Sequence, residues 1–80
     1  MQINATEVIN RIASKYSLSL PYEIVRMCYD SEADVLYAHF VANAEAIDSE
    51  ILEANENIIL GLNEKENIVR ITIMNASQFY

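Results

Sequence analysis

The sequence predicts an α+β domain in which an N-terminal helix packs on a four-stranded antiparallel sheet. Apolar residues recur with helical spacing over residues 5–16. They then alternate with other residues in two pairs of segments, 22–29 with 35–41 and 57–63 with 68–74. A short polar segment separates the members of each pair, which is typical of β-hairpins.

The helix is predicted from its N-terminal cap and its apolar stripe. Asn4 is a preferred N-cap residue, and Glu7, three residues later, completes a capping box. The stripe consists of Val8, Ile9, Ile12, Ala13 and Tyr16. Pro21 cannot continue a helix and favours an extended conformation at Leu20, so residues 17–21 are expected to form a linker.

The first hairpin surrounds an acidic turn at residues 30–34. Alternation places Val25, Met27 and Tyr29 on one face of the strand before the turn, and Ile24, Arg26 and Cys28 on the other. In the strand after it, Leu36, Ala38 and Phe40 oppose Val35, Tyr37, His39 and Val41. Because both faces of this second strand are largely apolar, we expect it to be central or covered.

The second half of the chain contains a less regular segment and a clear hairpin. Residues 47–53 are predicted to form a short strand, and residues 63–67 have the length and polarity of a hairpin loop in which Asn67 suits the left-handed conformation. Gly61, the only glycine, lies inside a strand and indicates a bulge or a close backbone approach rather than a phosphate-binding loop. The tail after Met74 is expected to be too short for a stable helical turn.

Composition bounds the class of protein. Eighty residues make one domain, 1–80, near the lower size limit for a single core, so association as a homodimer is expected. The net charge is −7 and the five basic residues are scattered, which argues against binding nucleic acid. The acidic surface either serves solubility or covers a partner protein with a basic surface. The lone Cys28 forms no intramolecular disulfide, and the chain has neither a signal-peptide pattern nor an apolar stretch that spans a membrane, so a cytoplasmic protein is expected.

Three parts of the sequence resemble a known family. They are the run from Tyr29 to Tyr37, which contains Asp30, Ala33 and Asp34; the apolar strand 58–63 with the acidic loop after it; and the final apolar strand, which closes on Ala76 and Ser77. Together they resemble the small bacterial domains grouped as domain of unknown function family 2283, over residues 24–77. The chain departs from the family pattern at Asn67 and Arg70, where glycine is common, and at Asn75, where aspartate is common. The resemblance implies an antiparallel β-meander, no established activity, and a partner-binding or antitoxin-like role; residues 1–21 look like an added helix.

Three groups of residues carry candidate chemistry. Asp30, Glu32 and Asp34 have carboxylates at the short spacing that a Ca²⁺ or Mg²⁺ site uses, but the pattern of an EF-hand is missing, and capping of turn amides is the alternative. His39 with Asp30 or Asp34 can act in acid–base chemistry, or His39 is a structural strand residue. Cys28 is either a small buried hydrophobe or a nucleophile that needs His39 beside it.

The sequence as a whole favours a non-catalytic protein-binding module, and no catalytic, cofactor-binding or metal-binding residue is assigned. The alternative is a small metal-dependent hydrolase or nuclease that uses Asp30, Asp34 and His39. Phe79 and Tyr80, near the end of the chain, are expected to dock on a second chain rather than in the core.

Overall fold

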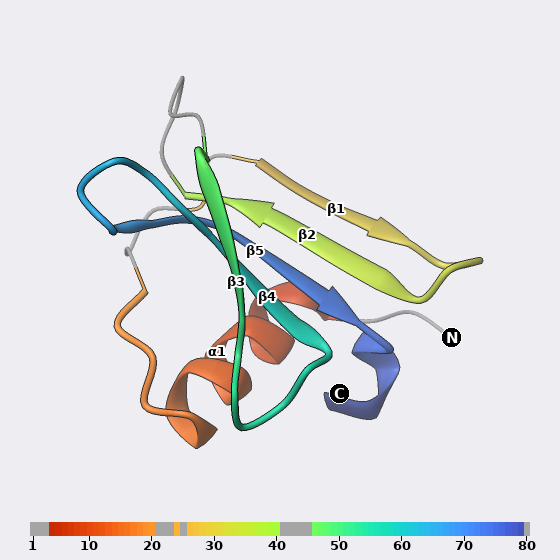
Figure 1. The fold of residues 1–80 in the computed structure, drawn as a ribbon. Coiled ribbons are helices and arrows are strands. Elements are labelled where there is room, and N and C mark those ends of the chain that lie inside the picture. Colours follow the sequence, from red (N-terminus) through yellow and green to blue (C-terminus); the bar gives the residue numbers. More distant parts are fainter. Residues whose placement is uncertain (1–3, 21–23, 25, 41–45, 80) are drawn as a thin grey trace.

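The computed structural model describes residues 4–20, 24, 26–40 and 46–79. In chain order, these residues form the helix α1 (Ala5–Lys15), the strands β1 (Arg26–Asp30), β2 (Val35–His39), β3 (Asp48–Ile51), β4 (Ile58–Leu62) and β5 (Ile68–Met74), and the 3₁₀ helix η1 (Ala76–Phe79) (Figure 1). The strand β5 spans the predicted range 68–74, α1 ends one residue before its predicted end, and β4 is one residue shorter at each end than predicted. None of the described helices is long and apolar enough to cross a membrane.

The described strands form one antiparallel sheet of five strands, in the order β1-β2-β5-β4-β3. The prediction of four strands in a meander was therefore wrong in two respects. The short strand predicted at residues 47–53 is present as β3 and adds a fifth strand to the sheet, and β5 lies between β2 and β4. The strands β2 to β5 thus have the spatial order of a Greek key.

The central place of β5 follows from its apolar residues. Val69, Ile71 and Ile73 are all buried on one face, as suits a strand that lies between two others. By contrast, every residue of β3 is exposed, as suits an edge strand. The expectation that β2 is not an edge strand is confirmed, because it lies between β1 and β5.

The helix α1 begins and ends through local hydrogen bonds. Its N-cap is confirmed, since the Asn4 side chain accepts a hydrogen bond from the Glu7 amide at 3.1 Å. At the other end, Ser17 has a φ of 54° and the Leu18 amide donates to the Ala13 carbonyl at 2.9 Å. These are the marks of a Schellman motif. The helix therefore stops well before Pro21, which lies outside the described residues.

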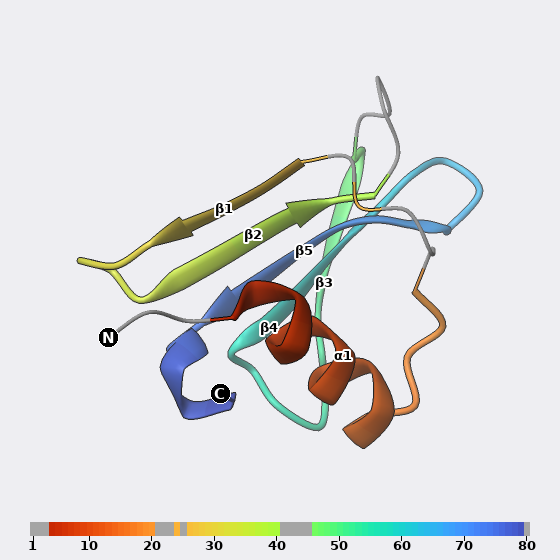
Figure 2. The ribbon, with the colours of Figure 1, turned by 180° about the vertical axis from the view of Figure 1, so that it is seen from behind.

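One face of the sheet, the covered face, packs against α1 (Figure 2). The core combines the helix stripe with alternate residues of the strands: Val8, Ile9, Ile12, Leu36, Ala38, Phe40, Ile58, Leu60, Ile71, Ile73 and Ala76. The predicted faces of β2 are thereby confirmed, with Leu36 and Ala38 inside and Tyr37 exposed. The opposite face, the open face, carries no second layer in the described part of the chain.

Two local predictions in the second half were wrong. In the β4–β5 loop the left-handed residue is Glu66, with a φ of 63°, and not Asn67. The side chain of Asn63 fixes this loop by accepting from the amides of Lys65 and Asn67 at 2.9 and 3.0 Å. The tail after Met74 does form a helical turn, η1, because contacts to the β1–β2 turn hold it in place.

Candidate functional site

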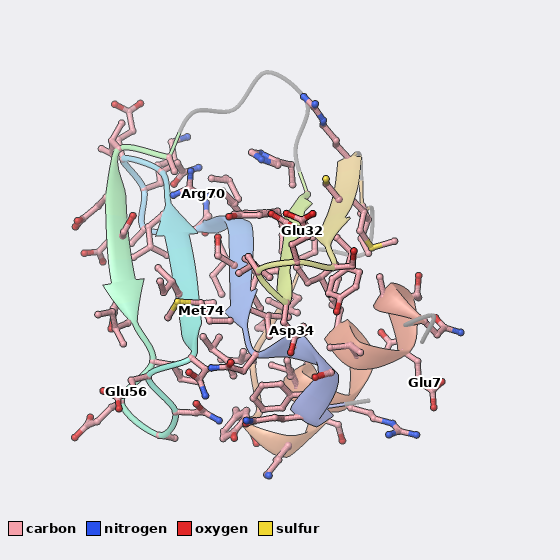
Figure 3. The ribbon with its side chains drawn as sticks, turned by 90° about the vertical axis from the view of Figure 1, so that its right-hand side faces the viewer. Glu7, Glu32, Asp34, Glu56, Arg70 and Met74 are labelled. Atoms are coloured by element: carbon pink, nitrogen blue, oxygen red, sulfur yellow. The ribbon has the colours of Figure 1, made fainter. Side chains whose placement is uncertain are left out.

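The densest group of polar contacts surrounds Asp34, at the end of the β1–β2 turn (Figure 3). The hydroxyl of Tyr29 donates to Asp34 Oδ1 at 2.6 Å, and the hydroxyl of Ser77 donates to Oδ2 at 2.6 Å. The Ser77 amide donates to Oδ1 at 3.1 Å, and the Ala76 amide donates to the Asp34 carbonyl at 3.0 Å. This Asp34 cluster (Tyr29, Asp34, Ala76 and Ser77) joins the first hairpin to η1.

The electrostatics of the Asp34 cluster favour a charged carboxylate. The hydrogen bond from the Ser77 hydroxyl, followed by the one from Tyr29, lowers the pKa of Asp34 below its usual value. The same contact with Asp34, helped by burial and by the charges of Asp34 and Asp30, raises the pKa of Tyr29. Asp34 is therefore a permanent acceptor at neutral pH, which suits a structural role and not that of a general acid.

Asp30 fixes the other end of the same turn. Its Oδ1 accepts hydrogen bonds from the amides of Glu32 and Ala33, at 3.0 and 3.3 Å. The interpretation of this acidic turn as one that caps its own backbone amides is thus confirmed for Asp30. Glu32 is exposed, and no group of three histidine, cysteine or acidic side chains among the described residues is arranged to hold a metal ion.

The residues of the alternative hydrolase site are not brought together. Asp34 directly precedes Val35, whereas His39 lies at the far end of β2, about 13 Å from Val35 along four residues of strand. His39 also occupies the open face and pairs with Arg26 and Arg70 across the sheet, while Asp34 is bonded to Tyr29 and η1. A shared site of Asp30, Asp34 and His39 does not form within one chain.

The expectation that Cys28 is buried was wrong. Cys28 is exposed, because β1 is an edge strand and its side chain points to the open face. It shares a shallow groove with Arg26, Tyr37 and His39. Cys28 pairs with Tyr37 and not with His39, so Cys28 and His39 are diagonal neighbours. Such neighbours lie about 7–8 Å apart, farther than the hydrogen bond that activates a nucleophile.

Sequence reasoning missed the arrangement around Arg70, at the opposite end of β2 from Asp34 (Figure 3). Gly61 faces Arg70, and a Cβ at Gly61 would lie only 3.0 Å from Arg70 Nε. The glycine thus lets the guanidinium lie close over the sheet, with Nη2 at 3.4 Å from Ser49 Oγ. The predicted bulge is confirmed, since the register shifts between Gly61 and Leu62. Because of this shift, Gly61 pairs with Arg70. Counting residues outward from the loop, with equal numbers on both strands, does not predict this pair.

A second groove on the open face lies next to Arg70. Its lining residues come from β2, β3, β4 and β5: Tyr37, His39, Ser49, Ile51, Ile59, Arg70 and Thr72. Tyr37 and Ile51 are exposed by 41% and 60%, so the groove offers apolar surface to solvent. Phe79, in contrast, packs against the core, so the prediction that it docks on a second chain was wrong. Tyr80 lies outside the described residues.

Comparison with known proteins identifies one family. The model of the family described as Protein of unknown function (DUF2283) matches residues 26–77, from the start of β1 to the Ser77 of the Asp34 cluster. No curated protein and no solved structure matches the chain. The match covers more than half of the chain and leaves α1 outside. The chain therefore belongs to the DUF2283 family, and its N-terminal helix precedes the family domain.

Proposed function

We propose that this chain is a non-catalytic protein-binding module that acts as a homodimer and binds a partner protein with a basic surface. The carboxylates with candidate chemistry support the non-catalytic part of the proposal. Asp30 and Asp34 accept hydrogen bonds that hold the turn and η1, and His39 lies at the far end of its strand.

The observation that carries the binding proposal is the surface around β3. Ile51 and Ile47 are exposed by 60% and 68% on the side of the open face. Asp48 and Glu50 alternate with them on the same exposed strand, and Glu53 and Glu56 follow in the turn to β4. Exposed apolar side chains with a charged rim are the usual composition of a protein interface. The negative charge of this rim fits a partner whose binding surface has an apolar centre surrounded by basic residues.

Within this proposal, the role is regulatory and of the antitoxin type, in which a small acidic protein covers a basic one. An acidic edge strand supports this form of binding, because complementary potentials speed encounter and discourage wrong partners. The exposed Cys28 fits the cytoplasm, where thiols stay reduced, and this is the compartment that we propose.

The test is co-purification of the tagged chain with proteins of its source, comparing two variants with the same charge change. Glu50→Lys alters the β3 surface, whereas Glu32→Lys alters the exposed tip of the β1–β2 turn. We expect a stoichiometric basic protein to be retained by wild type and by Glu32→Lys, and to be lost with Glu50→Lys. Equal retention by both variants, or a partner without basic surface, would contradict the proposal.

A further inference from the structure

The two edge strands of the sheet differ in their ability to pair with another copy of the chain. An exposed sheet edge is a template for strand pairing unless charge or shape blocks it. β3 is blocked, because antiparallel self-pairing centred on Ser49 sets Asp48 against Glu50. β1 carries one charge of each sign, Arg26 at its start and Asp30 at its end. Neither has an ionic partner among the described residues.

The hydrogen bonds of the sheet determine which backbone groups of β1 face outward. The Phe40 amide donates to the Val69 carbonyl at 3.0 Å, so even-numbered residues of β2 direct their backbone groups to β5. Tyr37 and His39 therefore direct theirs to β1, where they pair with Cys28 and Arg26. The alternate residues of β1, Met27 and Tyr29, consequently present their N–H and C=O groups at the free edge.

We propose that two copies of the chain pair through β1, antiparallel, about a two-fold axis at Cys28. In this register Met27 exchanges both backbone hydrogen bonds with Tyr29 of the partner subunit, and Tyr29 does so with Met27 of the partner subunit. Arg26 then lies opposite Asp30 of the partner subunit, on the same face, in each of the two symmetric positions. Cys28 lies opposite its own copy.

The charges select this register among those that the backbone allows. Centring the axis on Met27 places Arg26 opposite Cys28, and centring it on Tyr29 places Asp30 opposite Cys28. Of these three registers, only the one with its axis at Cys28 sets Arg26 of one copy opposite Asp30 of the partner subunit. Pairs of this even-numbered set are non-hydrogen-bonded across the new interface, with Cα atoms about 4.5 Å apart and side chains close together.

The pairing extends the sheet across the dimer and leaves β3 at both outer ends. This inference rests on the homodimer of the proposed function and specifies its interface. The surface around β3 takes no part in it, so the binding of a basic partner is tested separately.

The thiol of Cys28 can be used to test this interface in the native chain. Cys28 is the only cysteine and is exposed, and a Cα separation of about 4.5 Å lies inside the range that a disulfide bridges. Under mild oxidation we expect nearly complete conversion to a disulfide-linked species of twice 9.1 kDa on a non-reducing gel. The matched control is Tyr37→Cys in a Cys28→Ser background, which keeps one exposed thiol on the open face but one strand further in. Cross-linking of wild type no faster than this control would overturn the β1 interface.

A second variant tests the backbone pairing. Met27→Pro removes an outward N–H and leaves the ladder between β1 and β2 intact, and proline is tolerated on an edge strand in this orientation. We expect a folded variant, checked by circular dichroism, whose dimer dissociation constant rises at least about tenfold. If Met27→Pro keeps the dimer mass of wild type in light scattering, the β1 interface is wrong although the homodimer stands. If wild type itself has the mass of one chain at all concentrations, the homodimer fails with it.

Discussion

Replacing Asp34 by asparagine tests whether the Asp34 cluster stabilises the fold. The change keeps the shape of the side chain, and asparagine tolerates the left-handed backbone of this position, where φ is 56°. The carboxylate accepts three hydrogen bonds, from the Tyr29 hydroxyl and from the hydroxyl and amide of Ser77. Hydrogen bonds to a charged group contribute about 1.5–3 kcal/mol each and neutral ones about 0.5–1.5 kcal/mol. Because the cluster is only partly buried, we expect Asp34→Asn to lower the free energy of unfolding by about 1–2 kcal/mol.

Urea unfolding followed by circular dichroism measures this loss, and thermal unfolding should show a midpoint lower by about 5–15 °C, since 1 kcal/mol corresponds to about 4–8 °C in a domain of this size. Glu32→Gln is the matched control, because it makes the same chemical change at an exposed carboxylate of the same turn. We expect it to change stability by less than about 0.5 kcal/mol. Equal stabilities of Asp34→Asn and Glu32→Gln would refute the structural role of the cluster.

Three further results are expected from the same contacts and packing. Asp34 has a folded-state pKa below its ordinary value of 3.8, so its stabilising contribution is complete above pH 3.8 and is lost as the pH falls through the lowered pKa. In urea titrations below about pH 4, wild type should therefore lose its greater stability over Asp34→Asn. A difference in stability that does not change with pH would contradict this. Gly61→Ala should cost about 1–3 kcal/mol, because its Cβ would lie 3.0 Å from both Arg70 Cβ and Arg70 Nε, and Arg70→Gly on the same background should recover part of the loss. Ile73→Ala, at a fully buried position, should cost about 2–5 kcal/mol by urea unfolding, and a smaller loss would place Ile73 outside the core.

Residues of the family signature take part in the contacts that hold the fold together. Tyr29, Asp34, Ala76 and Ser77 belong to the residues by which the chain resembles its family, and they form one hydrogen-bonded cluster. Asp30, which also belongs to the signature, caps the turn between them. Matching the family therefore predicts how the first hairpin is tied to η1. Differences in function within such a fold have to come from exposed surfaces, as we propose for β1 and β3.

Local features could be predicted from the sequence because they depend on nearby residues. The Asn4 cap, the apolar stripe of α1, the alternating faces of β2 and the bounds of β5 all follow from neighbouring residue types and periodicity. The contact of Asp34 with Ser77 joins residues 43 positions apart, and no local pattern indicates it. The sequence indicated this contact only in that Asp34 and Ser77 both belong to the family pattern.

The order of the strands could not be predicted for the same reason. β2 pairs with β5, whose residues lie more than thirty positions later, while local hairpin signals indicate only neighbours in the chain. The exposure of Cys28 depends on this order too, because it follows from β1 being an edge strand. Alternation correctly gave the face of the strand on which Cys28 lies, but not whether that face is covered.

Hydrogen exchange at two backbone amides tests the homodimer most directly. The N–H groups of Met27 and Tyr29 point away from β2, and in the proposed dimer they are bonded only across the β1 interface. We predict that both amides exchange slowly at high protein concentration and become fast on dilution, whereas the Cys28 amide, bonded within the hairpin, stays protected throughout. Fast exchange at Met27 and Tyr29 at every concentration, with Cys28 protected, would contradict pairing through β1.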